Sequence, residues 1–371
     1  MFRNNFFHTI NRFSRRTIFT TSDLKKERVT IIGSGNWGTA IAKIIGENVQ
    51  KHDRLFETQV RQWVFEEEYN GKPLTQVINE THENPKYLPG IQLPNNIKAI
   101  PELEIACQNS SVLVFCLPHQ FANSVAKQLA NKIKPSPTSK IKAISLIKGF
   151  DIQPNGIQLY SKMIGDHLNL SHVAVLSGAN IANEVAREQF CETTIGSPSI
   201  QDGELFFKLF NTPYFKVNVI RDSIGAELCA ALKNIVAVAA GISDGLGYGS
   251  NTKAALIRIG LMEMKKFGNL FFGDTVEDNT FFESCGIADL ITTCFNGRNR
   301  KVAEAFVKTG KSIDILEMEL LHGQKLQGTL TALEVHQFLV QRNMVSEFPL
   351  FNAVYNIIYK NTPPHSILHN M

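Results

Sequence analysis

The residues best suited to chemistry are lysines in apolar surroundings. Lys233 lies inside the run Cys229-Ala-Ala-Leu-Lys-Asn-Ile-Val-Ala-Val238. An apolar environment disfavours the charged form of lysine and lowers its pKa toward values suited to proton transfer. The alternative is a lysine that extends to solvent while its methylenes pack on the helix surface. The apolar residues on both sides favour a lysine held inside for catalysis.

A second lysine and an aspartate are further candidates for the catalytic site. Lys148 directly follows the β-type run Ala143–Ile147, at the strand end where ligands bind in parallel sheets. Asp289 stands in Ala288-Asp-Leu-Ile-Thr292 and is a candidate partner that orients one of these lysines. The competing interpretations are a solvated loop lysine and an aspartate that caps a helix.

A basic segment suited to an anion precedes a predicted helix. Gly297-Arg298-Asn299 leads into the helical run Val302–Lys308. A phosphate there would accept a bidentate bond from Arg298, a bond from Asn299 and bonds from free backbone N–H groups. Thr292 or Thr293 could add a hydroxyl, and the sequence does not choose between them.

The glycine pattern Gly33-Ser34-Gly35-Asn36-Trp37-Gly38 predicts dinucleotide binding. It follows the apolar strand Arg28–Ile32 and precedes the predicted helix Thr39–Gly46. The first glycine would make the turn, the second would admit the pyrophosphate and the third would allow close helix packing. A glycine-rich turn with no ligand is the alternative.

The end of the second strand indicates which dinucleotide binds. Trp63-Val64-Phe65 is followed by Glu66-Glu67-Glu68, and no arginine stands there. A carboxylate accepts the ribose hydroxyls of NAD and repels a 2′-phosphate, so NAD is favoured over NADP. Phe65 is a candidate to pack on the adenine, or is simply a core aromatic.

Several other functions are not supported. The net charge of +4, with no RNP or zinc-finger spacing, argues against nucleic-acid binding. No metal motif is present, and no apolar run of about 18 residues suggests a membrane span. The six cysteines contain no Cys-x-x-Cys pair and are expected to be reduced. His119 follows the strand Ser111–Leu117 and is interpreted as a wall of the cofactor pocket rather than as a catalytic base.

Two kinds of element must position these residues. Short apolar runs alternate with helical stretches over residues 28–218, which predicts a Rossmann-type doubly wound α/β domain. Residues 219–371 are mainly helical in pattern and are expected to form an all-helical domain for substrate binding and dimerisation.

Residues 1–27 form an extension ahead of the first strand. Within 1–22, four arginines and no acidic residues accompany an amphipathic pattern of phenylalanines. This pattern is typical of a mitochondrial transit peptide, which would direct the protein to the matrix. A disordered tail on a cytoplasmic enzyme is the alternative, and we expect a cytoplasmic location.

The chain closely resembles the NAD-dependent glycerol-3-phosphate dehydrogenases of eukaryotes. The resemblance runs from about residue 28 to Tyr359. Its main motifs are Gly33–Lys43, Trp63–Glu67, His82–Asn84, Lys86–Gly90, Pro118–Phe121, Ser145–Gly149, Gly178–Ala182, Phe190–Gly196, Ala231–Asn234, Asp289–Cys294, Gly297–Phe306 and Gly323–Gly328.

The resemblance implies reversible reduction of dihydroxyacetone phosphate by NADH, in a homodimer with no nucleic-acid partner and no stable membrane insertion. It implies that Lys233 donates and accepts the proton, with Lys148 and Asp289 beside it in the catalytic set. The implied cofactor site comprises Gly33–Gly38, Phe65, Phe121, Ala182, Arg298, Lys325 and Gln327. The implied substrate site comprises Lys148, Asn234, Thr293, Arg298 and Asn299.

Two other functions remain open at this stage. A related two-domain hydroxyacid dehydrogenase would prefer a carboxylate substrate over a phosphate ester. A non-catalytic NADH-binding protein would bind the dinucleotide without hydride transfer, although the presence of Lys148, Lys233, Asp289 and Arg298 together argues against it.

Overall fold

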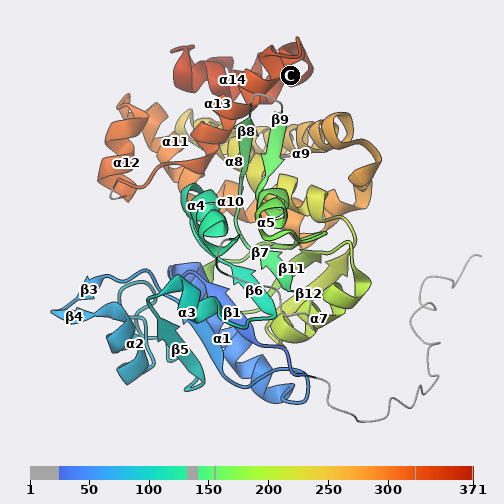
Figure 1. Cartoon of the computed structure of the whole chain (residues 1–371). Coiled ribbons are helices and arrows are strands. Elements are labelled where there is room, and N and C mark those ends of the chain that lie inside the picture. The colour runs from blue at the N-terminus through green and yellow to red at the C-terminus, as the bar shows by residue number, and fades with distance from the viewer. Residues whose placement is uncertain (1–24, 131, 133–140, 154–155, 322, 370) are drawn as a thin grey trace, which may run out of the picture.

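The computed structural model describes residues 25–130, 132, 141–153, 156–321, 323–369 and 371. Figure 1 shows a sheet-containing half, built from the N-terminal part of the chain, below a helical half built from the C-terminal part. Residues 1–24 of the predicted leader lie outside the described residues.

An eight-stranded sheet forms the core of the first half. In spatial order its strands are β12 (Phe215–Ile220), β11 (Cys191–Gly196), β10 (Ala174–Ser177), β7 (Lys142–Ser145), β6 (Val112–Phe115), β1 (Val29–Ile32), β2 (Val60–Trp63) and β5 (Ile97–Ile100). All neighbours are parallel except β10 and β11, which are antiparallel. The doubly wound sheet is therefore confirmed, with an added pair of strands running the other way at one edge.

Helices cover both faces of this sheet because its central strands are apolar on both sides. Ile31 packs into the cluster that contains residues of α1 (Asn36–Lys51) and α7 (Ile200–Phe210). Ile32, one residue later, packs into the opposite cluster. That cluster holds residues of α3 (Leu103–Cys107), α4 (His119–Ala130) and α5 (Tyr160–Leu168). The remaining elements here are α2 (Leu74–Thr81), α6 (Ala182–Ala186) and the hairpins β3 (Glu68–Tyr69)–β4 (Lys72–Pro73) and β8 (Phe150–Gln153)–β9 (Gly156–Leu159).

The second half is built around α8 (Ser223–Gly245). Around α8 are α9 (Ser250–Phe272), α10 (Asp289–Asn296), α11 (Arg298–Thr309), α13 (Gln327–Val340) and α14 (Pro349–Tyr359), and α12 (Ile313–Leu321) packs on α11. A π-helical turn, Ser284–Ala288, leads directly into α10. The predicted helical character of this half is confirmed.

Helix α8 is buried around its whole circumference. It is long and apolar enough to cross a membrane, but 94% of its most apolar window lies inside the protein. A helix that is hydrophobic on all sides is typical of a protein core, and here neighbouring helices supply the apolar surroundings. The neighbouring elements therefore bury the polar side chains of α8, including that of Lys233.

Candidate active site

The glycine loop joins β1 to α1 and leaves one open position. Gly33 has φ +119°, and a β-carbon there would lie 2.0 Å from the carbonyl oxygen of Cys116. A β-carbon at Gly38 would lie 2.6 Å from the Gly33 carbonyl oxygen, whereas one at Gly35 would meet no atom within 4 Å. Gly33 and Gly38 are thus required for packing, and the open space at Gly35 is where a pyrophosphate can approach the backbone.

Two buried amides hold this loop, and the sequence did not predict them. The side-chain nitrogen of Gln62 donates to the carbonyls of Gly33 (3.0 Å) and Gly38 (3.3 Å). The side-chain nitrogen of Asn84 donates to the Ser34 carbonyl and to the Thr39 hydroxyl, both at 2.9 Å. Asn84 lies in the His82–Asn84 motif, whose position in the chain gives no sign of this contact.

Two other loop residues use their side chains within the protein. The Asn36 amide donates to the Tyr87 carbonyl (2.8 Å) and to the Asn183 side chain (3.0 Å). The Trp37 ring packs 6.2 Å from the Phe215 ring, against the apolar cluster below the sheet. The Trp37 ring therefore takes part in packing α1 against the sheet.

The end of β2 presents an exposed aromatic beside acids that already have partners. Glu66 accepts bonds from the backbone and hydroxyl of Thr75, and Glu67 pairs with Lys86 (2.8 Å) and Tyr87 (2.6 Å). The structure therefore gives these carboxylates a role in holding the loop, which the sequence interpretation did not include. Phe65 is 69% exposed, as expected of a ring that could stack on adenine and not of a core residue.

Two further predicted cofactor residues lie on helices that follow strands of this sheet. Phe121, in the first turn of α4, is 53% exposed. Ala182 is the first residue of α6 and is partly exposed. Both rise from the carboxyl side of the sheet, where dinucleotides bind in folds of this kind.

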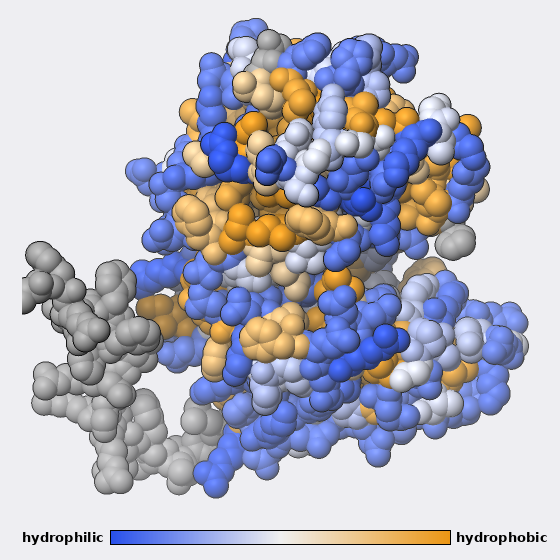
Figure 2. Space-filling view, turned by 180° about the vertical axis from the view of Figure 1, so that it is seen from behind, coloured by the Kyte–Doolittle hydropathy of each residue, from blue (hydrophilic) through white to orange (hydrophobic). Residues whose placement is uncertain are grey.

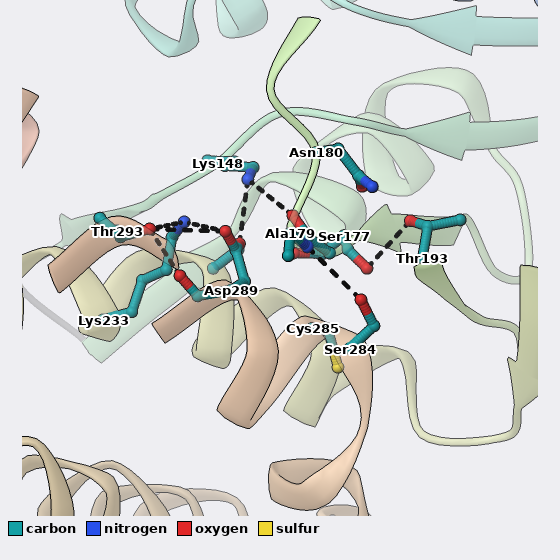
Figure 3. Close-up of polar contacts among 12 residues, drawn as sticks. Lys148, Ser177, Ala179, Asn180, Thr193, Lys233, Ser284, Cys285, Asp289 and Thr293 are labelled. Carbon is teal, nitrogen blue, oxygen red and sulfur yellow. Dashed lines mark hydrogen bonds and ion pairs between the residues drawn. The ribbon is translucent and has the colours of Figure 1, made fainter. Parts of the chain in front are cut away.

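The structure brings Lys148, Lys233 and Asp289 together between the two halves (Figure 3). One Asp289 oxygen lies 2.5 Å from the Lys233 nitrogen, and the other lies 3.0 Å from the Lys148 nitrogen. Lys148 also donates to the Gly178 carbonyl at 3.4 Å. Asp289 is the first residue of α10, yet its carboxylate faces the two lysines instead of capping the helix.

Burial and charge set the protonation state of this cluster. The side chains of Lys233 and Asp289 are 5% and 4% exposed, whereas that of Lys148 is 33% exposed. Burial lowers the pKa of Lys233 to about 8, with Asp289 opposing and Lys148 reinforcing the change. Burial raises the pKa of Asp289, but the two lysines outweigh it and hold that pKa below its usual value. The site therefore pairs a permanent anion with a lysine that titrates near neutral pH.

Thr293 is the threonine that reaches the cluster. Its hydroxyl accepts a bond from the Lys233 nitrogen at 2.7 Å and donates to the Asp289 carbonyl at 2.6 Å. These bonds fix the direction of the lysine side chain. Thr293 reaches the cluster because it lies one helical turn after Asp289, and which of Thr292 and Thr293 contacts a substrate anion stays a prediction.

The asparagines Asn234 and Asn299 form a buried bridge beside the lysine cluster. Asn299 donates to the Asn234 side-chain oxygen and accepts from the Gly328 backbone, both at 2.9 Å. These two bonds leave one amide hydrogen of Asn299 without a protein partner among them, and its contact with a substrate phosphate stays a prediction. The bridge ties α8, α11 and the start of α13 together next to Lys233.

The remaining predicted site residues are less buried than Lys233 and Asp289. Arg298 is exposed at the start of α11, and its guanidinium donates to the Gln324 side chain at 2.6 Å. Lys325 is exposed and pairs with Asp314 and Glu317, each at 2.7 Å, all within the helical half. Gln327 reaches the sheet half, where its amide nitrogen lies 3.1 Å from the His119 ring.

No cluster of three or more His, Cys, Asp or Glu side chains suited to a metal occurs in the described part of the chain. All six cysteines are free in the structure, and five of them are buried. Burial raises the pKa of the Cys294 thiol to about 12, so it is not a thiolate near neutral pH.

The fold and the site define a two-domain, dinucleotide-binding protein with a buried lysine–aspartate centre between its halves. Residues 28–202 match the model of the NAD-dependent glycerol-3-phosphate dehydrogenase N-terminus, and residues 222–369 match that of the C-terminus. The chain therefore belongs to the NAD-dependent glycerol-3-phosphate dehydrogenase family.

Individual relatives agree with this assignment. The chain is 54% identical to the glycerol-3-phosphate dehydrogenase 1-like protein of Xenopus tropicalis, over 92% of this chain and 95% of that protein. It is 52% identical to the cytoplasmic NAD(+) glycerol-3-phosphate dehydrogenase of Bos taurus, over 92% and 97%. The solved structure of glycerol-3-phosphate dehydrogenase from Saccharomyces cerevisiae superimposes with a TM-score of 0.87 at 44% identity, over 93% of this chain and 99% of that one.

Proposed function

We propose that this chain catalyses the reversible, NADH-dependent reduction of dihydroxyacetone phosphate to sn-glycerol 3-phosphate. The observation that carries the proposal is the Lys148–Asp289–Lys233 cluster between a dinucleotide-binding half and a helical half. The printed names of the relatives point to the same reaction. The domains would divide the work, with residues 28–218 binding NAD and residues 219–371 binding substrate.

The residues at the sheet edge fit a dinucleotide. The backbone at Gly35 is open to a pyrophosphate, and the N-terminus of α1 favours its negative charge. Phe65 and Phe121 expose rings on which an adenine base can stack. When bound, NADH supplies the hydride that this chemistry needs.

Lys233 would supply the proton. The ketone carbon accepts the hydride while the ketone oxygen takes a proton from the Lys233 ammonium, which leaves a neutral amine and a secondary alcohol. A pKa of about 8 lets Lys233 give up this proton in reduction and recover it in the reverse direction. Lys148, the more exposed of the two lysines, is placed to donate to substrate oxygens. Asp289 and Thr293 hold Lys233 in position.

Arg298 would recognise the phosphate. It is the first residue of α11, where the backbone N–H groups of the first helical turn are free to donate to an anion. Asn299 would donate its second amide hydrogen to the phosphate while its side chain also holds Asn234 and Gly328. Lys325 and Gln327 would contact the cofactor.

The protein would work as a cytoplasmic homodimer. Relatives with the cytoplasmic designation share more than half of the sequence, and the leader pattern leaves the mitochondrial matrix as the alternative. Figure 2 shows broad apolar areas on the rear of the helical half, which a second copy could cover. The exposed side chains of Ile291 (44%) and Phe295 (53%) on α10 are among the apolar residues of this half.

Substrate preference tests this function. We expect the purified chain to oxidise NADH with dihydroxyacetone phosphate and to respond weakly to NADPH and to unphosphorylated dihydroxyacetone. Preference for a 2-ketoacid would select the hydroxyacid dehydrogenase alternative. Tight NADH binding with no turnover on any of these substrates would instead indicate a non-catalytic binding protein.

A further inference from the structure

One side-chain contact joins helices that lie 208 positions apart in the chain. Gln327 is the first residue of α13 and His119 is the first residue of α4, and 3.1 Å separates the Gln327 amide nitrogen from Nδ1 of His119. The amide oxygen of Gln327 lies 3.8 Å from the position that a β-carbon at Gly149 would occupy. The Gln327 side chain therefore spans the space between α4 and the segment that follows Lys148.

The His119 ring also lies beside a buried aromatic ring. It packs 6.0 Å from the buried Tyr160 ring at an interplanar angle of 42°. Burial lowers the pKa of His119, which Asp151 of β8 opposes, and its place at the start of α4 also disfavours positive charge. A neutral imidazole has one acceptor nitrogen, so Nδ1 accepts from the Gln327 amide and Nε2 carries the hydrogen.

The contact lies along the route that a bound dinucleotide must take. His119 follows β6 and Gly149 follows β7, both at the carboxyl edge of the sheet where ligands bind. A dinucleotide with its pyrophosphate at Gly35 and its reactive ring near Lys233 must cross this edge. In Figure 1, α4 stands between the sheet half and the helical half, as this placement requires.

We propose that His119 is a positioning residue that holds Gln327, and with it the start of α13, against the bound dinucleotide. This inference rests on the proposed function, because it takes the ligand at the sheet edge to be NADH. His119 transfers no proton to the substrate. Its Nδ1 accepts one hydrogen bond, and that bond favours the arrangement of the two halves that binds NADH more tightly.

Matched amide variants of the full-length chain test the role of one ring nitrogen. The His119→Asn variant places an amide oxygen close to the position of Nδ1, whereas His119→Gln places its amide near Nε2. We expect His119→Ala and His119→Gln to raise the Kd for NADH three- to tenfold, equivalent to about 0.7–1.4 kcal/mol. His119→Asn should stay within about twofold of the wild type. Binding is measured by NADH fluorescence, and thermal unfolding shows whether each variant is folded.

A double-mutant cycle completes the test. Gln327→Ala should raise the Kd by at least the factor seen for His119→Ala, because it also removes the cofactor contact of Gln327, and adding His119→Ala to it should cause little further loss, because that bond is already gone. Equal effects of the Asn and Gln variants, or multiplying effects in the double variant, would overturn the proposal. Loss of the proposed function is a separate result, since it would appear as a wild-type chain that binds NADH but does not reduce dihydroxyacetone phosphate.

Discussion

Replacing Asp289 by asparagine removes the anion that faces both Lys148 and Lys233. The change keeps the size of the side chain, and the Lys233 nitrogen that lay 2.5 Å from a carboxylate oxygen then faces a neutral amide. Breaking a buried ion pair by removing one partner costs about 3–5 kcal/mol. Lys233 can avoid most of this cost by losing its proton.

The size of the effect follows from that energy. Since one pKa unit corresponds to about 1.4 kcal/mol, a loss of about 3–4 kcal/mol lowers the pKa of Lys233 by about two to three units. The wild-type pKa of about 8 would then fall to about 5–6. Near pH 7.5 the proton donor would be mostly absent, and we expect reduction to slow by roughly 25- to 240-fold.

The assay is the pH dependence of kcat for dihydroxyacetone phosphate reduction. The wild type should lose activity as pH rises through about 8, and Asp289→Asn should lose it at the lower pH. The control is Asp244→Asn, which removes an aspartate that pairs with Lys253 (2.8 Å) and Arg300 (2.5 Å). This control should lose stability while keeping the wild-type inflection. An unchanged inflection in Asp289→Asn would refute the electrostatic account of Lys233.

Three further experiments test the proton donor and the phosphate contact. Lys233→Met should lower kcat by at least about 100-fold, the scale of a general acid, while NADH binding measured by fluorescence stays within about twofold; substantial remaining turnover would exclude Lys233 as the donor. In the wild type, glycerol 3-phosphate oxidation should rise through a pH of about 8 as reduction falls, because oxidation requires neutral Lys233 and reduction requires its charged form. Rates that move in the same direction in the two assays would contradict the assignment. Arg298→Ala should raise the KM for dihydroxyacetone phosphate at least about tenfold and change the response to unphosphorylated dihydroxyacetone little, whereas an equal loss on both would exclude a phosphate role.

Much of the fold could be predicted because its signals are local. The strand before Gly33, the helix after Gly38 and the apolar run around Lys233 each show their type within a few residues. The antiparallel pairing of β10 with β11 could not be predicted, because strand direction at a sheet edge depends on distant parts of the chain. The path that the chain takes between residues 177 and 191 sets the direction of β11 relative to β10.

The site was predictable in its residue types and less so in its contacts. The apolar neighbours of Lys233 correctly indicated burial, and the strand end correctly placed Lys148 at the sheet edge. The bonds of Asn299 to Asn234 and Gly328 could not be predicted, because a side chain at a helix start can turn inward as well as outward. Gln62 and Asn84 have no sequence signal, since their hydrogen-bond partners are mainly backbone carbonyls that any residue provides.

The fate of the hydride tests the central claim most directly. With NADH that carries deuterium in the transferred position at C4 of the nicotinamide, the purified chain should convert dihydroxyacetone phosphate to glycerol 3-phosphate with one deuterium on the carbon that bore the ketone. Mass spectrometry of the product measures this transfer, and Lys233→Met should form little labelled product. Product that lacks the label, or label that remains in the nicotinamide while NADH is unconsumed, would contradict direct hydride transfer at this site.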